Sequence, residues 1–212
     1  MKFPPVSQAD ENGLLAIGGD LDLETLKEAY LHGIFPWPIS VELPLAWFSP
    51  DPRGILPTDQ FVVNRTLQKS LNSNKYTFKM NTCFDRVIRS CALHHEFYKK
   101  GDCETWITPE MIDGYNLLFD NGLAYSAELY NENNFLVGGV YGVKFNNFYS
   151  GESMFFLESN ASKITLYHLI NHLKANNIPF LDIQMVTPTT EKLGGIEISR
   201  DQFLRDIKSL LI

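Results

Sequence analysis

The sequence lacks most of the features that mark disulfide-bonded, metal-binding or membrane-spanning proteins. Its 212 residues include only three cysteines, Cys83, Cys91 and Cys103, and none has the CxxC spacing of a zinc or redox site. No run approaches the roughly 18 apolar residues that a membrane helix requires. The first residues, MKFPPVSQAD, also lack the basic and apolar segments of a secretion signal. We therefore expect a cytoplasmic protein with reduced thiols and no membrane span.

Familiar catalytic motifs are missing as well. None of the five histidines lies in an HExxH frame, and the chain contains no GxSxG motif. His168 and His172 are four residues apart and would share one helix face, but no third metal ligand accompanies them. The sequence therefore indicates neither a conventional nucleophile nor a bound metal.

Positive charge is scarce overall but concentrated in one segment. The formal net charge is -7, which argues against a protein that coats nucleic acid regardless of sequence. Residues 53–100 nevertheless carry nine basic and three acidic side chains. Such a separation is expected when one face meets phosphate and another meets a cationic partner, although an ordinary solvated helix face gives the same pattern.

The chain divides into a proline-rich beginning and an alternating remainder. Up to residue 57 we expect one helix, over residues 23–32, with Asp22 as its N-cap and Gly33 as its stop. Beyond that point, apolar spacing and turn residues predict alternating elements. The expected helices cover 65–72, 84–95, 109–121, 161–176 and 201–211; the expected strands cover 76–80, 123–130, 135–145, 147–156 and 180–185, of which the middle three form an antiparallel meander. This order predicts an α/β (α+β) fold with a small N-terminal domain (1–57) and a mixed-sheet domain (58–212).

The segment YSGESMF combines a carboxylate with glycines in a predicted strand. Gly138, Gly139, Gly142 and Gly151 interrupt these central strands, and glycine weakens a strand unless another backbone or a ligand approaches closely. Strict alternation would place Ser150, Glu152 and Met154 on one face, and Tyr149, Gly151, Ser153 and Phe155 on the other. An unpaired buried carboxylate is costly. Glu152 therefore either meets an internal Arg or Lys or awaits a cationic substrate.

Two further polar positions interrupt the apolar strand FLDIQM. Asp182 and Gln184 are two residues apart, so they share one face of a strand that otherwise belongs in a core. Such pairs serve as structural hydrogen-bonding devices or deliver catalytic groups to a sheet edge. Between the two strands, the segment SNASK begins a long helix whose free N–H groups can hold an anion or a carbonyl, or can simply be capped by Ser159 or Asn160.

Nine ordered motifs resemble those of the leucyl/phenylalanyl-tRNA-protein transferase family. Each is weak alone, but together they span nearly the whole chain at compatible spacing. They are FPP (3–5), NGLLAxGGDL (12–21), AYxxGIFPW (29–37), WFSPDPR (47–53), TWIT (105–108), LVGGVYGV (136–143), GESMF (151–155), NASK (160–163) and LDIQ (181–184).

The resemblance implies a fold and a reaction. The fold would be a family-specific N-terminal domain followed by a GNAT-like (acyl-CoA N-acyltransferase-like) domain. The reaction would move leucine or phenylalanine, and methionine less well, from aminoacyl-tRNA to the α-amino group of proteins that begin with Arg or Lys, for N-end rule degradation. No cofactor is needed because the ester is already activated, and we expect a monomer. An α-amine with a pKa of roughly 7.7–8.0 needs only orientation and modest proton acceptance.

The resemblance also assigns residues to roles. Gln184 would contact the attacking amine, Asp182 would polarise or orient it, and Glu152 would help to position the substrates. The aminoacyl pocket would be formed by Met154, Tyr149, Val140, Leu169 and Leu173. The terminal adenine would stack on Trp47 or Phe48 and on Trp106, at about 1–3 kcal/mol per base. The expected contacts to tRNA phosphates are Arg65, Lys69, Lys75, Arg86 and Arg89.

This sequence departs from the family pattern at three positions, and two rival functions remain. Tyr125 and Tyr130 replace a usual histidine and tryptophan, and Thr189 replaces a usual histidine. An acetyl-CoA-dependent N-acetyltransferase would need a glycine-rich turn before the long helix, and SNASK has no glycine. A non-catalytic RNA-binding protein would use residues 53–100 and would leave Asp182 and Gln184 without purpose.

Overall fold

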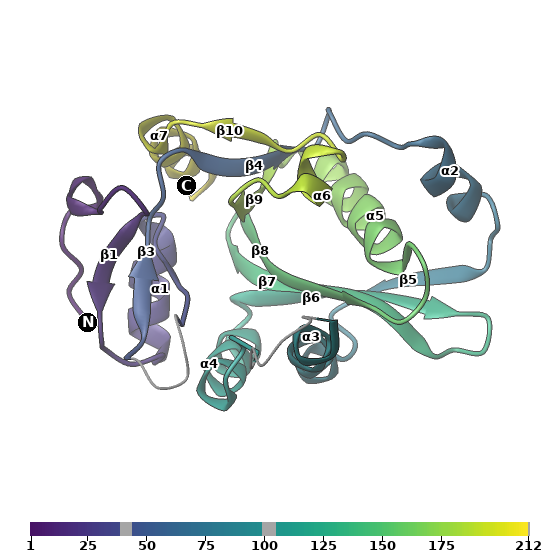
Figure 1. The fold of residues 1–212 in the computed structure, drawn as a ribbon, viewed down its shortest axis with the longest axis horizontal. Helices are drawn as coiled ribbons and strands as arrows, with labels where there is room; N and C mark the ends of the chain where they lie inside the picture. The colour runs from purple at the N-terminus through teal and green to yellow at the C-terminus, as the bar shows by residue number, and fades with distance from the viewer. Residues whose placement is uncertain (39–43, 99–104, 212) are drawn as a thin grey trace.

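The computed structural model describes residues 1–38, 44–98 and 105–211. Two sheets are present, a three-stranded one near the N-terminus and a seven-stranded one that forms the body of the molecule (Figure 1). The small sheet contains β1 (Leu14–Ile17), β3 (Ala46–Phe48) and β2 (Phe35–Pro36), in that order. The large sheet has the order β10-β4-β9-β8-β7-β6-β5. Its strands are β4 (Arg53–Pro57), β5 (Tyr76–Met80), β6 (Ala124–Asn131), β7 (Leu136–Phe145), β8 (Phe148–Phe156), β9 (Phe180–Gln184) and β10 (Ile196–Ile198).

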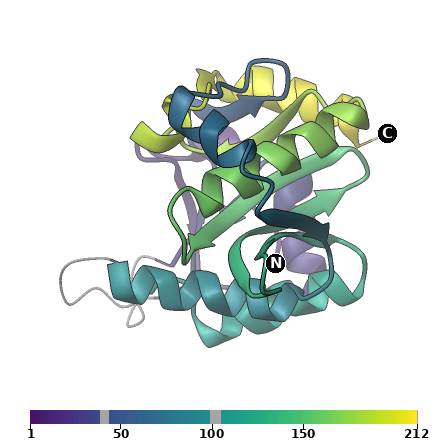
Figure 2. The same cartoon turned by 90° about the vertical axis from the view of Figure 1, so that its right-hand side faces the viewer.

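Helices cover both faces of the large sheet. In both views α5 (Ala161–Ala175) lies on one face, while α3 (Phe84–Tyr98) and α4 (Pro109–Asp120) lie on the other (Figures 1 and 2). Two buried clusters correspond to these faces: one contains side chains of α3, α4 and the N-terminal region, and the other lies under α5. The remaining helices are η1 (Val6–Gln8), α1 (Leu23–Leu31), α2 (Arg65–Leu71), α6 (Pro188–Glu191) and α7 (Arg200–Leu210).

Most elements begin and end within a few residues of the predicted bounds. Asp22 accepts a hydrogen bond from the Thr25 backbone N–H at 2.9 Å and so caps α1 as expected. Pro109 occupies the first turn of α4. Strands β6, β7 and β8 pair antiparallel in succession and confirm the predicted meander. The predicted fold class, a small N-terminal region followed by a mixed-sheet α/β domain, is confirmed.

Several strands were not predicted, namely β1 to β4 and β10. Strand β4 pairs antiparallel with β9 and with β10, so residues 53–57 contribute to the large sheet. The predicted division after residue 57 stays a prediction, and β4 places the end of the proline-rich segment with the larger unit. The N-terminus of α7 is tied to the chain just before β4, because the Arg200 guanidinium donates to the Ser49 carbonyl at 2.7 Å.

Strands β8 and β9 run parallel but share a single registered pair, Ser150 with Asp182. Beyond this pair the two strands separate, and Glu152 on β8 and Gln184 on β9 both line a cavity. The large sheet is therefore split at its centre, and the split creates room for a ligand between two strands.

Two of the three cysteines lie in the described part of the chain. Cys83 and Cys91 carry free thiols, and Cys103 lies outside the described residues. No helix among the described residues is long and apolar enough to cross a membrane. Within the same residues, no group of three or more His, Cys, Asp or Glu side chains could hold a metal ion.

Candidate active site

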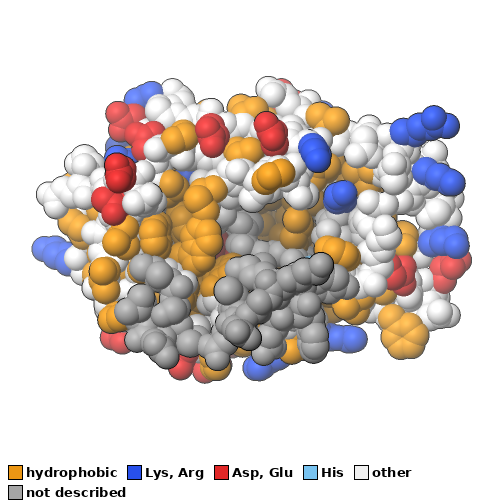
Figure 3. Space-filling view, in the orientation of Figure 1, with side chains coloured by type: hydrophobic (Ala, Val, Ile, Leu, Met, Phe, Trp, Pro, Cys, Tyr) orange, Lys and Arg blue, Asp and Glu red, His pale blue; other side chains and the backbone are white. Residues whose placement is uncertain are grey.

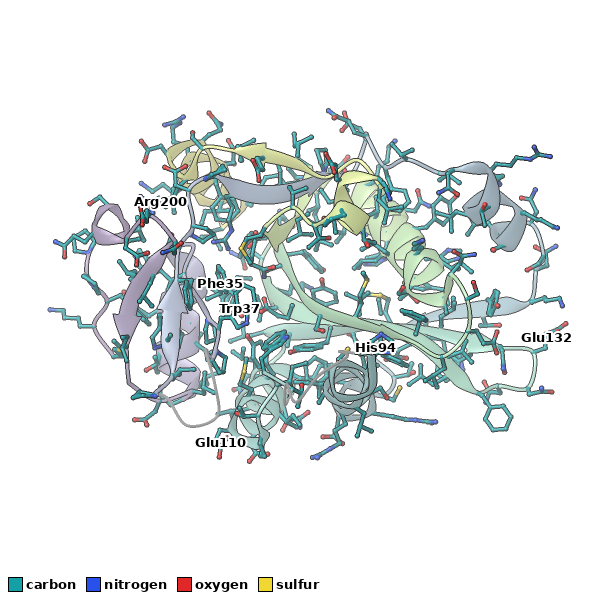
Figure 4. All side chains as sticks on the ribbon, viewed as in Figure 1. Phe35, Trp37, His94, Glu110, Glu132 and Arg200 are labelled. Carbon is teal, nitrogen blue, oxygen red and sulfur yellow. The ribbon has the colours of Figure 1, made fainter. Side chains whose placement is uncertain are left out.

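A cavity of about 750 Å³ opens where β8 and β9 separate. Figure 3 shows a hollow in this face, bordered by hydrophobic side chains. Glu152 and Gln184 supply polar groups, and Val140, Met154 and Leu166 supply apolar surface. Phe35 and Trp37 point from the N-terminal region toward the large sheet (Figure 4) and form another wall of the cavity. The cavity is thus lined by both parts of the molecule.

The backbone of Gln184 adopts a left-handed conformation. Its φ is +56°, which only glycine and asparagine adopt readily. Holding a glutamine there costs on the order of 1–3 kcal/mol, and such conformations cluster at functional sites. The conformation ends β9 and turns the chain, because the Met185 N–H donates to the Ile183 carbonyl at 2.6 Å. Gly54 on the facing strand allows this turn, since a Cβ there would lie 2.6 Å from the Met185 carbonyl carbon.

The Asp182 side chain stabilises this conformation of Gln184 through a hydrogen bond. Its Oδ1 atom accepts the Gln184 backbone N–H at 3.1 Å. The same carboxylate accepts two hydrogen bonds from the Arg53 guanidinium, Nε to Oδ1 at 2.8 Å and Nη2 to Oδ2 at 2.7 Å. Both side chains are fully buried, and the guanidinium also donates to the Gly33 carbonyl at 2.9 Å. Asp182 does not line the cavity; it acts on the site through Gln184 and is therefore a positioning residue.

Glu152 belongs to a hydrogen-bonded network rather than to an ion pair. Its Oε1 accepts from the Gln184 side-chain amide at 3.1 Å and from the Ser150 hydroxyl at 3.1 Å. Its Oε2 accepts from the Tyr115 hydroxyl at 3.2 Å, and Tyr115 is hydrogen-bonded to Tyr30 of α1. No Arg or Lys of the described residues forms a salt bridge with Glu152. The internal Arg or Lys considered above is thus not found beside Glu152 among the described residues, and neutral donors occupy its place.

Burial alters the acidity of this carboxylate. Loss of hydration raises the pKa of Glu152 to about 7 from its ordinary 4.5, and the negative charge of Asp182 acts in the same direction. Hydrogen bonds from Tyr30, Ser150 and Tyr115 oppose the rise because they stabilise the ionised form. A carboxyl with a pKa near neutral can accept and return a proton at cellular pH.

A bulge changes the faces predicted for β8. Gly142 pairs with Gly151 and Tyr141 with Ser153, so β8 has one extra residue at this point and the alternation reverses. As a result Tyr149 and Met154 pack toward the same buried cluster, whereas strict alternation had put them on opposite faces. Gly142 is required because a Cβ there would overlap the Ser150 carbonyl oxygen. The glycines thus mark a close backbone approach, as their presence in strands indicated.

Only some of the residues predicted for the aminoacyl pocket line the cavity. Val140 and Met154 line the cavity. Leu169 and Leu173 are fully buried, Tyr149 is nearly so, and none of these three is part of the cavity lining. They lie in the core under α5, where Leu169 and Leu173 are on the side of the helix that faces the sheet. The remaining apolar surface of the cavity comes from Leu166, Leu181, Ile183 and Phe156, which the sequence did not single out.

The aromatic residues predicted to stack on adenine are also separated. Trp106 lines the cavity, with its ring centroid 6.3 Å from that of Trp37. Phe48 is partly exposed and lies behind the lining, 6.1 Å from Trp37. Trp47 points the other way: it is fully buried, and its indole N–H donates to the Gly18 carbonyl at 2.8 Å. The stacking role predicted for Trp47 does not fit this placement, because protein covers its ring.

The five predicted phosphate contacts do not form a single patch. Arg65 and Lys69 belong to α2 and Lys75 precedes β5, at the right of Figure 1. Arg86 and Arg89 belong to α3, on the opposite face of the sheet. Arg89 also forms an exposed ion pair with Asp85 at 2.9 Å. The basic segment therefore contributes charge to two sides of the molecule.

The family departures occupy distinct environments. Tyr125 is buried and donates to the Ser150 carbonyl at 3.3 Å. Tyr130 contacts the buried Glu128 carboxylate, which also accepts from the Thr82 backbone N–H at 2.8 Å. Thr189 lines the cavity. Tyr125 thus contacts the backbone of β8, a strand of the site, and Thr189 faces the cavity.

Four residues that complete the site were not singled out from the sequence: Arg53, Ser150, Tyr30 and Tyr115. Arg53 lies in the WFSPDPR motif, and the expectation of an internal cation beside a buried strand carboxylate could have pointed to it. That expectation attached the cation to Glu152, whereas the structure attaches it to Asp182. For Tyr30 and Tyr115 no local signal exists, because their hydroxyls meet only when α1 and α4 pack together.

Transfer of an acyl group from an activated ester to an amine requires an apolar pocket for the acyl chain and polar groups that orient the amine, without a covalent nucleophile. The cleft between β8 and β9 provides both, and the matching family model and relatives show that the protein is an enzyme of the aminoacyltransferase class. A family model described as "Leucyl/phenylalanyl-tRNA protein transferase" matches residues 55–208, and a model of the N-terminal domain of the same family matches residues 19–51. The chain belongs to the leucyl/phenylalanyl-tRNA-protein transferase family.

Two relatives in sequence agree with this assignment. A leucyl/phenylalanyl-tRNA--protein transferase of Colwellia psychrerythraea is 45% identical over 210 residues, which cover 96% of this chain and 85% of that protein. One of Flavobacterium johnsoniae is 44% identical over 207 residues, covering 98% and 95% respectively. Among solved structures, L-PGS from Bacillus licheniformis aligns at 12% identity with a TM-score of 0.49, over 90% of this chain and 70% of that one.

Proposed function

We propose that the protein transfers leucine or phenylalanine, and methionine less well, from aminoacyl-tRNA to the α-amino group of proteins that begin with arginine or lysine. The extended proteins then enter N-end rule degradation. In this proposal the enzyme works in the cytoplasm as a monomer and without a cofactor. Family membership and the names of the relatives support the transferase activity, and the cleft supports the substrates as follows.

The orientation of the Gln184 amide carries the proposal. Its Nε2 atom donates to Ser150 at 2.8 Å and to the Glu152 carboxylate at 3.1 Å. A carboxylate can only accept, so the NH₂ end of the amide must face Glu152. The amide oxygen then has no hydrogen-bond partner among the described residues and is available to accept an N–H of the incoming amine. This is the orientation that an attacking amine requires.

The reaction balances within the substrates. The α-amine nitrogen attacks the ester carbonyl carbon and forms a C–N bond, and the bond from that carbon to the ribose oxygen breaks. The amine loses one proton as it becomes an amide nitrogen, and the ribose hydroxyl that leaves gains one. Glu152, with its pKa near 7, accepts and returns this proton in the proposed mechanism, while Gln184 holds the amine and Asp182 holds Gln184.

The other residues that line the cavity suit the aminoacyl-tRNA donor and the protein acceptor. Val140, Met154 and Leu166 offer apolar surface, and the flexible, unbranched Met154 can adapt to leucine, phenylalanine or methionine. Trp106 and Trp37 offer ring surface for the terminal adenine. An acceptor with a cationic first residue is favoured by Glu152, whose carboxylate has no salt bridge within the described residues.

A transfer assay tests the proposal directly. Radiolabelled Phe-tRNA is incubated with a peptide that begins with arginine, and the label is expected to appear on the peptide. The same peptide with an acetylated N-terminus is the matched control, because it keeps every side chain but has no nucleophile. A non-catalytic RNA-binding protein would label neither peptide, and an acetyltransferase would modify the free peptide only with acetyl-CoA. Equal labelling of peptides that begin with arginine and glutamate would contradict the acceptor preference.

The pH dependence of the transfer rate should show whether Glu152 takes part in the proton transfer. Below pH 7 both Glu152 and the α-amine, whose pKa is roughly 7.7–8.0, must lose a proton before reaction. The logarithm of kcat/KM for the wild-type enzyme is therefore expected to rise with a slope approaching about two, and that of Glu152→Gln with a slope of about one. Initial rates measured between about pH 5.5 and 8 would show the difference. Identical slopes would exclude Glu152 from the proton transfer.

Stability provides an independent check on the same carboxyl. Its folded-state pKa lies above its ordinary value, so the folded protein binds an extra proton between pH 4.5 and about 7. The stability contributed by Glu152 is thus present below this window and is lost as the pH rises through it. In Glu152→Gln the free energy of unfolding is expected to fall less between pH 4.5 and about 7 than in the wild type. Denaturant unfolding at these two pH values measures the difference.

A further inference from the structure

The N-terminus of α5 opens into the same cleft as Gln184. Four consecutive or nearly consecutive residues of this turn line the cavity: Ser159, Asn160, Ser162 and Lys163. Asn160 is the N-cap residue, but its φ of +66° turns its side chain away, and it makes no capping hydrogen bond to the helix. Its amide donates instead to the Ser70 hydroxyl at 3.3 Å. The first turn of a fifteen-residue helix is therefore left uncapped beside a cavity.

Two backbone N–H groups of this turn have no acceptor. The Ala161 N–H donates to the Glu158 carbonyl at 3.0 Å, and the Ile164 N–H donates to the Asn160 carbonyl at 2.9 Å. Between them, the N–H groups of Ser162 and Lys163 make no hydrogen bond with any described residue. Free N–H groups at a helix start carry partial positive charge and bind anions.

The Ser162 side chain is a second and independent indication of a ligand. Only 6% of this residue is exposed, and it lines the cavity. Its hydroxyl makes no hydrogen bond with a described residue, and the oxygen is open to the cavity rather than enclosed in the core. Other serines and threonines near helix starts in this protein are used as caps, as Thr108 is for α4 and Ser199 for α7. Ser162 serves no such purpose and faces the ligand space.

The local charge also selects an anion. Lys163 lines the cavity and forms no ion pair with a described residue. The nearest acidic residue in the sequence, Glu158, is already engaged, because it accepts from Tyr76 and from Asn131 at 2.8 Å each. The turn therefore has four hydrogen-bond donors on the cavity: the Lys163 ammonium group, the Ser162 hydroxyl and two backbone N–H groups. No carboxylate of the described residues forms an ion pair with Lys163. These are the donors that hold a phosphate.

We propose that this turn binds the phosphodiester on the 5′ side of the terminal adenosine of aminoacyl-tRNA. The inference rests on the proposed function, because an aminoacylated 3′-adenosine with its acyl group beside Met154 and its ester beside Gln184 carries one negatively charged group nearby, its 5′ phosphate. The subsite would fix the distance of the ester carbonyl from Gln184. Its contribution should appear in KM for substrates that carry the phosphate.

The test compares two small donors, phenylalanyl-adenosine and its 5′-phosphorylated form, with the same arginine-initial peptide. For the wild-type enzyme the phosphate is expected to raise kcat/KM by about tenfold or more, the range of a charge-assisted hydrogen bond. Ser162→Ala and Lys163→Ala are each expected to lose most of this gain, mainly through KM. Lys163→Arg should retain it. Lys174→Ala removes an exposed lysine from the last turn of the same helix and is the matched control, with the full gain expected.

The outcomes separate the subsite from the function. If the phosphate gives the same gain in the wild type, Ser162→Ala and Lys163→Ala, the proposed subsite is wrong while the transfer activity stands. If the wild-type enzyme uses neither donor and also fails with Phe-tRNA, the proposed function falls and the subsite falls with it. Inorganic phosphate provides a further check: competition against the phosphorylated donor that disappears in Ser162→Ala supports the subsite, and equal competition in both enzymes opposes it.

Discussion

Replacement of Arg53 by methionine is expected to lower the free energy of unfolding by about 3–5 kcal/mol, the cost of removing one partner from a buried ion pair. Arg53 and Asp182 are both fully buried, and the guanidinium makes two hydrogen bonds to the carboxylate. It also lies over the rings of Phe35 at 4.9 Å and Phe203 at 4.5 Å. The substitution would leave Asp182 charged and nearly unpaired inside the protein.

Urea unfolding of purified variants measures this effect, and the chain offers a matched control. Arg89 and Asp85 form an ion pair of similar length at 2.9 Å, but both side chains are more than half exposed. Arg89→Met should therefore cost less than about 1 kcal/mol. The double variant Arg53→Met with Asp182→Leu removes both buried charges and is expected to recover much of the lost stability. Equal losses for Arg53→Met and Arg89→Met would contradict a buried pair.

The double variant also separates folding from function. Asp182 accepts the backbone N–H of Gln184, so its removal leaves the left-handed turn of Gln184 without its support. The refolded double variant should accordingly remain slow in transfer even where its stability is restored. Stability and activity thus depend on the same carboxylate through different neighbours, Arg53 on one side and Gln184 on the other.

Local signals were sufficient to predict the meander and the helices other than the short η1 and α6. Asp22 and Pro109 mark helix starts, and the alternating segments between residues 123 and 156 form antiparallel neighbours through short turns. The helix and meander predictions depend on the period of a single segment, which a sequence displays directly. The shared site of Glu152 and Gln184 was implied by the family resemblance rather than by the period of either strand.

What could not be predicted depends on contacts between distant segments. Strand β4 follows a proline-rich stretch and is a strand only because β9 and β10 flank it. Arg53 meets Asp182 across a separation of 129 residues. The bulge in β8 brings Tyr149 and Met154 to the same face, and no residue pattern predicts which of several glycines will lie at the bulge. The resemblance offered Trp47 or Phe48 for stacking, and because adjacent strand residues point to opposite sides, Trp47 lies in the core.

The conformation of Gln184 leads to the second large expected effect. Gln184→Gly removes the side chain but suits a φ of +56°, because glycine adopts the left-handed region without a steric cost. Turnover in transfer is expected to fall by about 10²–10³-fold, the range seen when one preorganised polar group of an active site is removed. The free energy of unfolding is expected not to fall and to rise by up to about 1 kcal/mol, since the backbone strain is relieved.

Gln184→Asn is the matched variant, because asparagine also tolerates the left-handed region and keeps an amide, but on a chain one methylene shorter. It should retain stability and still lose turnover, because its amide no longer reaches both Ser150 and Glu152. Affinity for Phe-tRNA, measured by filter binding, is expected to change little in either variant. A parallel loss of affinity and turnover would show that Gln184 binds the donor rather than the amine. Unchanged turnover in Gln184→Gly would remove it from the reaction, and the strained turn at the end of β9 would then need another explanation.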